Sequence, residues 1–280
     1  MMLMEPFFVG PLAVWTHVPK KEHPKARVLL IHGLSEHSGR HLNTIQHLIG
    51  SGIEVVRFDL RGSGRSGGRR QWVERFDDYV QDVAHTFHWI EENLAPLPLY
   101  VLGHSLGGAI AIYYAAFYPK DCSGLVLSAP AFLVGSGISS VKILIAKLLE
   151  RFAPTLKIPG STDFTAISRD ENVRTDYRED PLCNHFNTLQ QGNEILRALP
   201  GIPDQCRRIR VPTLIVHGSM DQLVKLEGSF QILEALASQD KMLQVIPGGF
   251  HEPHNDLCKE EYFAILDAWF KTRLNDDTRA

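Results

Sequence analysis

Residues 99–108, with the sequence LYVLGHSLGG, decide which fold this chain is expected to adopt. An apolar run ends there in the pattern Gly-x-Ser-x-Gly, whose serine is Ser105, and small and apolar residues follow at 109–117. The pattern is typical of a strand, a sharp turn that exposes a serine hydroxyl, and a helix. Glycines permit the strained turn and let the strand and the helix approach closely. Although the five-residue pattern is weak by itself, in this context it predicts that Ser105 is a catalytic nucleophile.

The composition is that of an ordinary soluble globular protein. Of the 280 residues, 44% are hydrophobic and 22% are charged. A net charge of −3 is too small to indicate a nucleic-acid partner. The sequence has no run of about 18 apolar residues that would predict a membrane-spanning helix. Residues 1–10 lack the basic start of a signal peptide, and Pro6 interrupts their apolar residues. We therefore expect a cytoplasmic protein.

Neither a metal nor an organic cofactor is expected. The cysteines have no metal-ligand spacing and predict free thiols; they are Cys122, Cys183, Cys206 and Cys258. Residues 62–67 match G-x-G-x-x-G, but a polar loop continues beyond them, and no acidic residue ends a strand about 20 residues on, as dinucleotide binding requires. His32, Glu36 and His37 match no zinc-enzyme spacing, and the proline within residues 251–254 would disrupt the helix that such a site needs.

Predicted strands and helices alternate in two stretches of the chain. The expected strands lie at residues 9–18, 27–31, 54–58, 99–102, 124–127, 211–216 and 242–246. The expected helices lie at residues 42–50, 76–94, 109–117, 228–237 and 260–274. The helix at 76–94 has the clearest pattern, because its apolar residues recur at a spacing of about 3.6. Such alternation predicts a parallel sheet with helices on both faces.

The alternation breaks between residues 130 and 201. An apolar helix is expected at 138–152, polar loops follow it, and no run resembles a strand of comparable strength. An insertion at this point would lie over the carboxyl ends of the strands, where open α/β sheets bind their ligands. It would therefore act as a cap. We divide the chain into a first core part at 1–130, a cap at 131–203 and a second core part at 204–280.

A catalytic serine needs a histidine that accepts its proton and a carboxylate that orients this histidine. In a fold of this kind the chain order is serine, acid and histidine. Asp221 lies just past the predicted strand at 211–216, and therefore at the edge of the sheet where Ser105 is expected. Asp204 and Asp240 do not directly follow a strand. We predict that Asp221 is the acid, although aspartate is also common in turns as a purely structural residue.

The ends of further strands supply the remaining catalytic groups. His251 directly follows the strand at 242–246, whereas the competing His254 lies further from the strand end, so we predict that His251 is the base. The oxyanion of the reaction needs two backbone N–H donors. We expect them from Leu106, which follows the serine, and from Leu34, in the loop after the second predicted strand.

The chain resembles the monoacylglycerol lipase and lysophospholipase branch of the α/β-hydrolases over most of its length. The resemblance rests on HGLSEHSGR at 32–40, DLRGSGRS at 59–66, GHSLG at 103–107, YREDPL at 177–182 and VPTLIVHGSMD at 211–221. It implies an α/β-hydrolase fold, in which a mostly parallel central sheet is flanked by helices and carries a helical cap. It also implies a triad of Ser105, Asp221 and His251, with the N–H groups of Leu34 and Leu106 as the oxyanion hole.

The resemblance further suggests a polar pocket for the leaving group. The residues that would line it are Glu36, Arg40, Tyr177 and His254. Alternatively, these residues form hydrogen bonds and an ion pair that only stabilise the loops. Two positions depart from the family pattern, because His41 replaces a usual tyrosine and Asn255 replaces a basic residue of related lipases. The cap is the least similar region, which leaves the identity of the substrate open.

The expected activity is that of a serine carboxylester hydrolase. It would cleave monoacylglycerols or similar single-chain lipid esters to a fatty acid and an alcohol through an acyl-enzyme, without a cofactor. A lysophospholipase or a general short-chain carboxylesterase is the alternative. A peptidase, a thioesterase or a non-catalytic binding module would also share this fold.

An apolar stripe in the cap favours a lipid acyl chain. At helical spacing it comprises Ile138, Val141, Leu144, Ile145, Leu148, Leu149 and Phe152. Such a stripe either packs on the core or forms an acyl tunnel or a membrane-facing surface. Lys142, Lys147 and Arg151 would face anionic headgroups or simply solvent. The expected partners are a small lipid ester and, through the cap, the surface of a membrane, with no nucleic acid.

Overall fold

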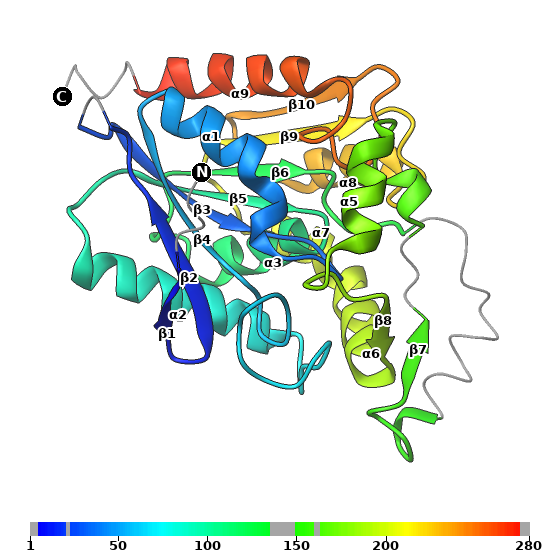
Figure 1. Ribbon diagram of the computed structural model, residues 1–280. Helices are drawn as coiled ribbons and strands as arrows, with labels where there is room; N and C mark the ends of the chain where they lie inside the picture. Colours follow the sequence, from blue (N-terminus) through cyan, green and yellow to red (C-terminus); the bar gives the residue numbers. More distant parts are fainter. Residues whose placement is uncertain (1–4, 21–22, 135–148, 160–162, 275–280) are drawn as a thin grey trace.

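The computed structural model describes residues 5–20, 23–134, 149–159 and 163–274. Within them, a sheet of eight strands has the order β1-β2-β4-β3-β5-β6-β9-β10. These strands are β1 Phe7–Val9, β2 Leu12–His17, β3 Ala26–Ile31, β4 Ile53–Phe58, β5 Leu99–His104, β6 Gly124–Ser128, β9 Thr213–Gly218 and β10 Lys241–Ile246. Strand β2 is antiparallel to β1 and β4, and all the other neighbours are parallel. The expected mostly parallel sheet is therefore confirmed (Figure 1).

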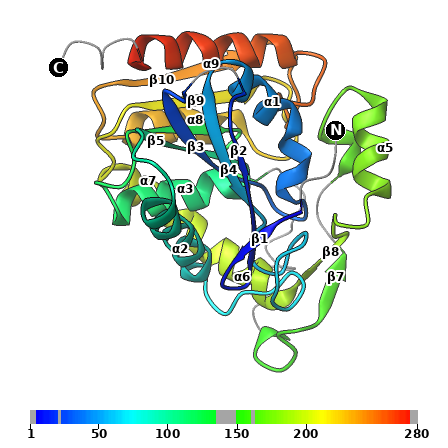
Figure 2. The same ribbon diagram turned by 60° about the vertical axis from the view of Figure 1, so that its left-hand side comes forward.

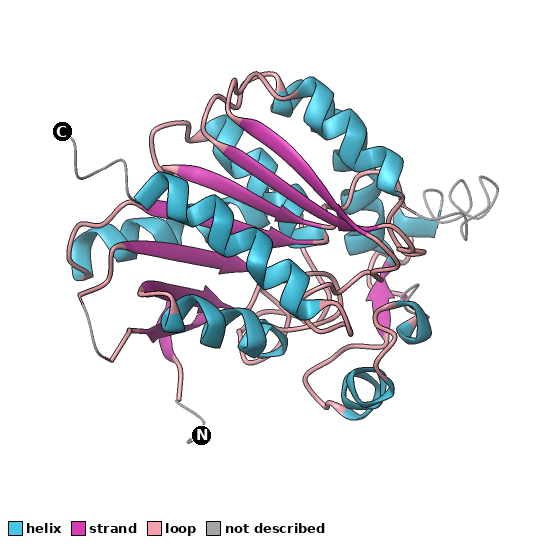
Figure 3. Cartoon of the chain, turned by 90° about the horizontal axis from the view of Figure 1, so that it is seen from above, coloured by secondary structure: helices cyan, strands magenta, loops and turns pink. Residues whose placement is uncertain are grey.

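Helices flank both faces of the sheet, as Figure 3 shows from above. They are α1 Leu42–Gly50, α2 Asp77–Asn93, α3 Leu106–Phe117, α7 Ile202–Cys206, α8 Leu226–Ala235 and α9 Lys259–Leu274. Successive side chains of a strand point to opposite faces. In β3, Val28 and Leu30 belong to the apolar core shared with α1 and α9. Leu29 and Ile31 belong to the core shared with α2, α3 and α8.

A smaller group of elements lies at the carboxyl ends of the parallel strands (Figures 1 and 2). It contains β7 Lys157–Pro159, α5 Glu171–Glu179, β8 Phe186–Thr188 and α6 Leu189–Ala198. The Asn184 N–H donates to Ser35 O in the loop after β3, and the Glu252 N–H in the loop after β10 donates to Ile167 O. These bonds hold the group against the loops that carry the predicted catalytic residues.

Between residues 130 and 201, where no strand of comparable strength was expected, the structure contains the short antiparallel pair β7 and β8. Each has only three residues, which is too short to produce a periodic pattern. Of the helix expected at 138–152, residues 138–148 lie outside the described residues. In the described part of the chain, no helix is both long and apolar enough to cross a membrane.

The single strand expected at 9–18 is wrong in detail. The chain turns at Gly10, whose φ is +55°, and forms the hairpin of β1 and β2. Glycine adopts this left-handed conformation without steric cost. The strand expected at 211–216 begins and ends two residues later, as β9. Asp221 therefore lies in the turn three residues after the strand.

The contact between β5 and α3 depends on two glycines. A Cβ atom at Gly103 would lie 2.3 Å from the backbone oxygen of Gly107. A Cβ atom at Gly107 would lie 2.2 Å from the backbone oxygen of Ile31 in β3. Such distances are too short for any side chain, so the helix packs directly on the backbone of the strands and places the turn between them.

This contact predicts opposite effects for two glycine-to-alanine substitutions. Gly103→Ala should lower the free energy of unfolding by about 3 kcal/mol or more, because the backbone of α3 must move away. Gly192→Ala is the matched control, since it lies within α6 with open space around it. It should raise stability by about 0.5–1 kcal/mol, as expected for a glycine inside a helix. Urea unfolding of both variants measures the difference, and equal effects would contradict the contact.

Candidate active site

Ser105 lies where the sequence predicts it, in a strained turn between β5 and α3. Its φ is 53° and its ψ is −118°, a conformation that costs a residue with a side chain about 1–3 kcal/mol. Backbone hydrogen bonds maintain it. The Ser105 N–H donates to Ser128 O over 2.9 Å, and its carbonyl accepts from the N–H groups of Gly108 and Ala131, each over 2.9 Å. Hydrogen bonds to β6, to α3 and to the loop after β6 thus hold Ser105 in its strained conformation.

Asp221 and His251 form a buried hydrogen-bonded pair. His251 Nδ1 donates to Asp221 Oδ2 over 2.7 Å, and the other carboxylate oxygen accepts from the N–H groups of Leu223 and Val224 over 2.8 and 3.0 Å. This arrangement fixes the tautomer of His251 with its Nε2 free to accept a proton. Among the described residues, no hydrogen bond joins Ser105 Oγ to His251. Catalytic hydrogen bonds are often long before substrate binds.

The surroundings of the pair favour an ionised Asp221 and a protonated His251. Burial alone would raise the pKa of Asp221, but His251 and His217 hold it well below its usual range. Burial alone would lower the pKa of His251, but the charge and hydrogen bond of Asp221 raise it above its usual 6.5. His104 lies beside His251, with ring centres 4.8 Å apart. Burial and His251 lower the pKa of His104 well below its usual value, so it stays neutral.

The competing acids predicted from the sequence lie elsewhere. Asp204 pairs with Arg207, and Asp240 pairs with Arg273, in both cases on the surface. The competing His254 pairs with no carboxylate among the described residues. The arrangement therefore favours Asp221 and His251 over each rival.

The two predicted oxyanion donors flank the serine. Leu106 is the first residue of α3, where helix N–H groups lack internal acceptors and the helix dipole favours negative charge. Leu34 follows Gly33, whose N–H donates to Glu36 Oε1 over 2.5 Å. A Cβ atom at Gly33 would lie 3.2 Å from Ser105 Cβ, so this loop passes directly beside the serine. Within the described part of the chain, neither leucine N–H donates to a protein acceptor.

A buried polar cluster brings together three of the predicted leaving-group residues. Arg40 Nη2 donates to Glu252 Oε2 over 2.7 Å, and Arg40 Nε lies 3.5 Å from Glu36 Oε2. The guanidinium also lies 4.7 Å from the centre of the Tyr177 ring. Two carboxylates therefore neutralise Arg40, which stiffens this wall of the site.

His254, the fourth predicted leaving-group residue, joins the cluster through His41. The two rings stack with centres 4.4 Å apart, and His41 Nε2 lies 3.1 Å from Glu36 Oε1. The His254 side chain is buried, and neither of its ring nitrogens has a hydrogen-bond partner among the described residues. Burial and His41 lower the pKa of His254 well below its usual value. The neutral ring therefore keeps one donor and one acceptor without a protein partner among the described residues.

Sequence reasoning missed two carboxylates close to His251. Glu252 accepts from Arg40 and from Asn255 Nδ2. Asp256 accepts from the N–H groups of Phe250 and Arg169 over 3.0 and 2.7 Å. The available signal was a pair of acidic residues in a loop beside the predicted base, since buried carboxylates require partners.

Of the residues considered for a metal, His32 already uses both ring nitrogens, with Gly33 O and the Leu60 N–H as partners. His37 instead approaches Asp180 and Cys183. These three side chains form a group with metal-ligating atoms in the described part of the chain.

The Asp256 contacts predict a loss of stability on neutralisation. Asp256→Asn should lower the free energy of unfolding by about 1.5–3 kcal/mol, because hydrogen bonds to a buried charge are lost. The folded-state pKa of Asp256 lies below its usual range, since the backbone bonds more than offset the effect of burial. Its contribution is therefore present above the unfolded pKa and disappears as the pH falls through the folded one. Denaturant unfolding at neutral and acid pH measures this, with the exposed Asp204→Asn as control; a neutral Asp256→Asn would contradict it.

Comparison with known proteins agrees with the geometry. Residues 22–258 match the family described as Hydrolase_4, serine aminopeptidase S33. A monoacylglycerol lipase of Mycolicibacterium smegmatis is 37% identical over 93% of this chain and 92% of its own. The human monoglyceride lipase is 33% identical over 89% of this chain and 84% of its own. A crystal structure of the monoacylglycerol lipase of Paleococcus ferrophilus superposes with a TM-score of 0.83 at 29% identity, covering 92% of this chain and 97% of that one. The fold and the sequence together establish that the chain belongs to this family of α/β-hydrolases, on its monoacylglycerol lipase-like branch.

Proposed function

We propose that the protein is a serine hydrolase that cleaves monoacylglycerols to a fatty acid and glycerol. The observation that carries the proposal is the 2.7 Å hydrogen bond between His251 and Asp221, in loops at the same edge of the sheet as the strained Ser105. The relatives named monoacylglycerol lipase and monoglyceride lipase support an ester of glycerol as the substrate class.

In the first half of the reaction, Ser105 Oγ attacks the ester carbonyl while His251 Nε2 accepts the serine proton. Asp221 holds the imidazole in place and stabilises its charged form. The N–H groups of Leu34 and Leu106 donate to the oxyanion of the tetrahedral intermediate. The bond to the glycerol oxygen then breaks, and glycerol leaves with the proton from His251.

In the second half, a water molecule takes the place of glycerol. His251 accepts a proton from the water as its oxygen attacks the acyl-enzyme carbonyl, and the same backbone donors stabilise the second oxyanion. When the bond to Ser105 Oγ breaks, His251 returns the proton to the serine. The fatty acid is released and the free enzyme is restored.

His254 is the group best suited to the glycerol hydroxyls. Its ring lies 4.9 Å from that of His104, which in turn adjoins His251. Its two unpartnered nitrogens are one donor and one acceptor, which suit two hydroxyls of a ligand once the buried ring becomes accessible. Glu36 and Arg40 are committed to each other and to Glu252, so we assign them to holding this wall and the oxyanion loop.

Residues 131–203 would serve as the cap over the acyl chain. In its described part, Leu149, Phe152 and Leu156 expose 42%, 83% and 47% of their surface. These three exposed apolar side chains lie close together in the sequence, and a contiguous apolar surface would favour contact with a lipid. We therefore include peripheral contact with a membrane in the proposal, and a location in the cytoplasm remains a prediction.

The substrate class is tested with glycerol esters that differ only in the length of the acyl chain. Hydrolysis of 1-monoacylglycerols from two to eighteen carbons should exceed that of lysophospholipids, thioesters and aminoacyl amides. Ser105→Ala should lower kcat by about 10⁶-fold, whereas the exposed Ser123→Ala serves as control and should leave kcat unchanged. Activity confined to short esters would indicate a general esterase, preference for lysophospholipids or amides would overturn the glycerol ester, and turnover by Ser105→Ala would overturn the nucleophile.

The shifted pKa of His251 sets the pH dependence. The base must be neutral to accept the serine proton, so kcat/KM should fall as the pH falls through a value above 6.5. Asp221→Asn removes the charge that raises this pKa, so the inflection should move to lower pH while kcat drops by about 10⁴-fold. Asp240→Asn, which alters a surface carboxylate, is the control. An unchanged inflection in Asp221→Asn would contradict the pairing.

A further inference from the structure

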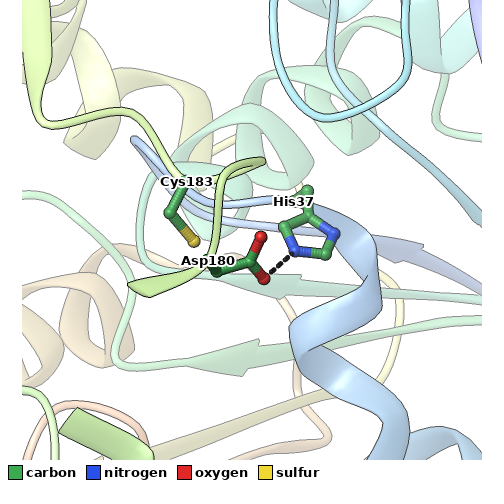
Figure 4. A group of neighbouring side chains, drawn as sticks. All are labelled: His37, Asp180 and Cys183. Atoms are coloured by element: carbon green, nitrogen blue, oxygen red, sulfur yellow. Dashed lines mark hydrogen bonds and ion pairs between the residues drawn. The ribbon is translucent and has the colours of Figure 1, made fainter. Parts of the chain in front are cut away.

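We propose that His37, Asp180 and Cys183 form a binding site for a zinc-like divalent cation. Each offers one ligand atom, His37 Nε2, a carboxylate oxygen of Asp180 and Cys183 Sγ, and no two of these atoms are more than 4.8 Å apart. Figure 4 shows the three side chains pointing toward one another from two separate segments of the chain. None of them takes part in the chemistry proposed above, so the failure of this site would leave the proposed function intact.

Local hydrogen bonds hold both segments in place. His37 precedes the short helix at Ser38–His41, and its Nδ1 accepts from the Gly39 N–H over 3.2 Å. Asp180 follows α5, and its Oδ1 accepts from the Leu182 N–H over 2.8 Å. The Asn184 N–H donates to Ser35 O over 2.9 Å, which ties the turn after α5 to the loop that carries His37. These bonds hold the two segments that carry the ligands next to each other before any ion binds.

The donor set is the one that zinc prefers. Zinc binds imidazole nitrogen, carboxylate oxygen and thiolate sulfur in tetrahedral geometry, at about 2.0–2.2 Å for nitrogen and oxygen and about 2.3 Å for sulfur. Three protein ligands leave the fourth position to water. A cavity of about 500 Å³ is lined by His37 and Asp180, though not by Cys183, and gives these two ligands a route to solvent. Asp176 and Glu179 also line it and would attract a cation, and their charges oppose that of Arg40, which lines the same cavity.

Binding requires rearrangement of the side chains, because ligand atoms that now lie up to 4.8 Å apart must come within roughly 3.3–3.7 Å of one another around a tetrahedral ion. His37 Nε2 and Asp180 Oδ2 are now 2.8 Å apart, whereas two such ligands of one tetrahedral ion lie roughly 3.3 Å apart. The Nε2 proton, which now points at Asp180, would move to Nδ1 and end the bond from Gly39. The thiol of Cys183 would release its proton to solvent and bind as the thiolate.

An ion at this position would link two functional parts of the molecule. His37 belongs to the loop that carries Leu34 and Glu36, and Asp180 directly follows the helix that carries Tyr177. A metal bound between them would hold α5 against the oxyanion loop. It would also stabilise the folded state, because the complete ligand set exists only there.

Titration of the purified protein with Co²⁺ and with Zn²⁺ tests the site. Co²⁺ should bind one equivalent with a thiolate charge-transfer band and tetrahedral visible bands, and Zn²⁺ should displace it and raise Tm. Cys183→Ser and His37→Gln should each weaken binding by about 100-fold or more, since losing even an outer partner costs about 10–100-fold. Cys258→Ser, which alters a partly accessible thiol outside the site, should bind as the unmodified protein does.

Three results of these titrations would overturn the site. They are the absence of stoichiometric binding, a Co²⁺ spectrum without a thiolate band, and affinity that Cys183→Ser and His37→Gln leave unchanged. Because Cys183 is buried, Tm in the presence of EDTA establishes that each variant is folded. Asp180→Asn gives an independent measure at a less buried ligand, and unchanged affinity in that variant would also exclude the three-ligand geometry.

Discussion

The direct contact between the backbones of β5 and α3 determines where the functional groups of this protein lie. Gly103 and Gly107 leave no room for a side chain at either position. The chain must therefore reverse sharply between them, and Ser105 takes up a left-handed φ that few residues other than glycine adopt. Its backbone bonds to β6 and to the loop after it balance this strain. The other loops at this edge of the sheet are arranged around the turn that carries Ser105.

The charged side chains around Ser105 are buried, so each needs an oppositely charged or hydrogen-bonding partner. Asp221 satisfies both carboxylate oxygens, one with backbone N–H groups and one with His251. Arg40 is shared between Glu36 and Glu252. Removing one partner of such a buried pair costs far more than the pair contributes to stability. These interactions are thus better understood as fixing the positions of loops, in particular the loop that carries Leu34 and Glu36, than as strengthening the fold.

The parallel sheet and its flanking helices were predictable because long periodic segments dominate them. The location of Ser105, Asp221 and His251 at one edge of the sheet was predictable, because each follows a predicted strand and the carboxyl ends of parallel strands share that edge. The hairpin at Gly10 and the pair β7–β8 were not, because three-residue strands leave no period in the sequence. Contacts between distant segments were hidden as well. Asp59, for example, accepts from the Ser38 N–H over 2.9 Å, and no local pattern reveals such a bond.

Covalent labelling of the unmodified protein with a fluorophosphonate, followed by peptide mapping, tests most directly whether Ser105 is an activated nucleophile. This reagent phosphonylates a serine only when a nearby base activates it. If His251 activates Ser105, one adduct per molecule should form, located on Ser105, and His251→Ala should lower the labelling rate by orders of magnitude. An adduct on a different serine, or equally fast labelling of His251→Ala, would contradict this activation.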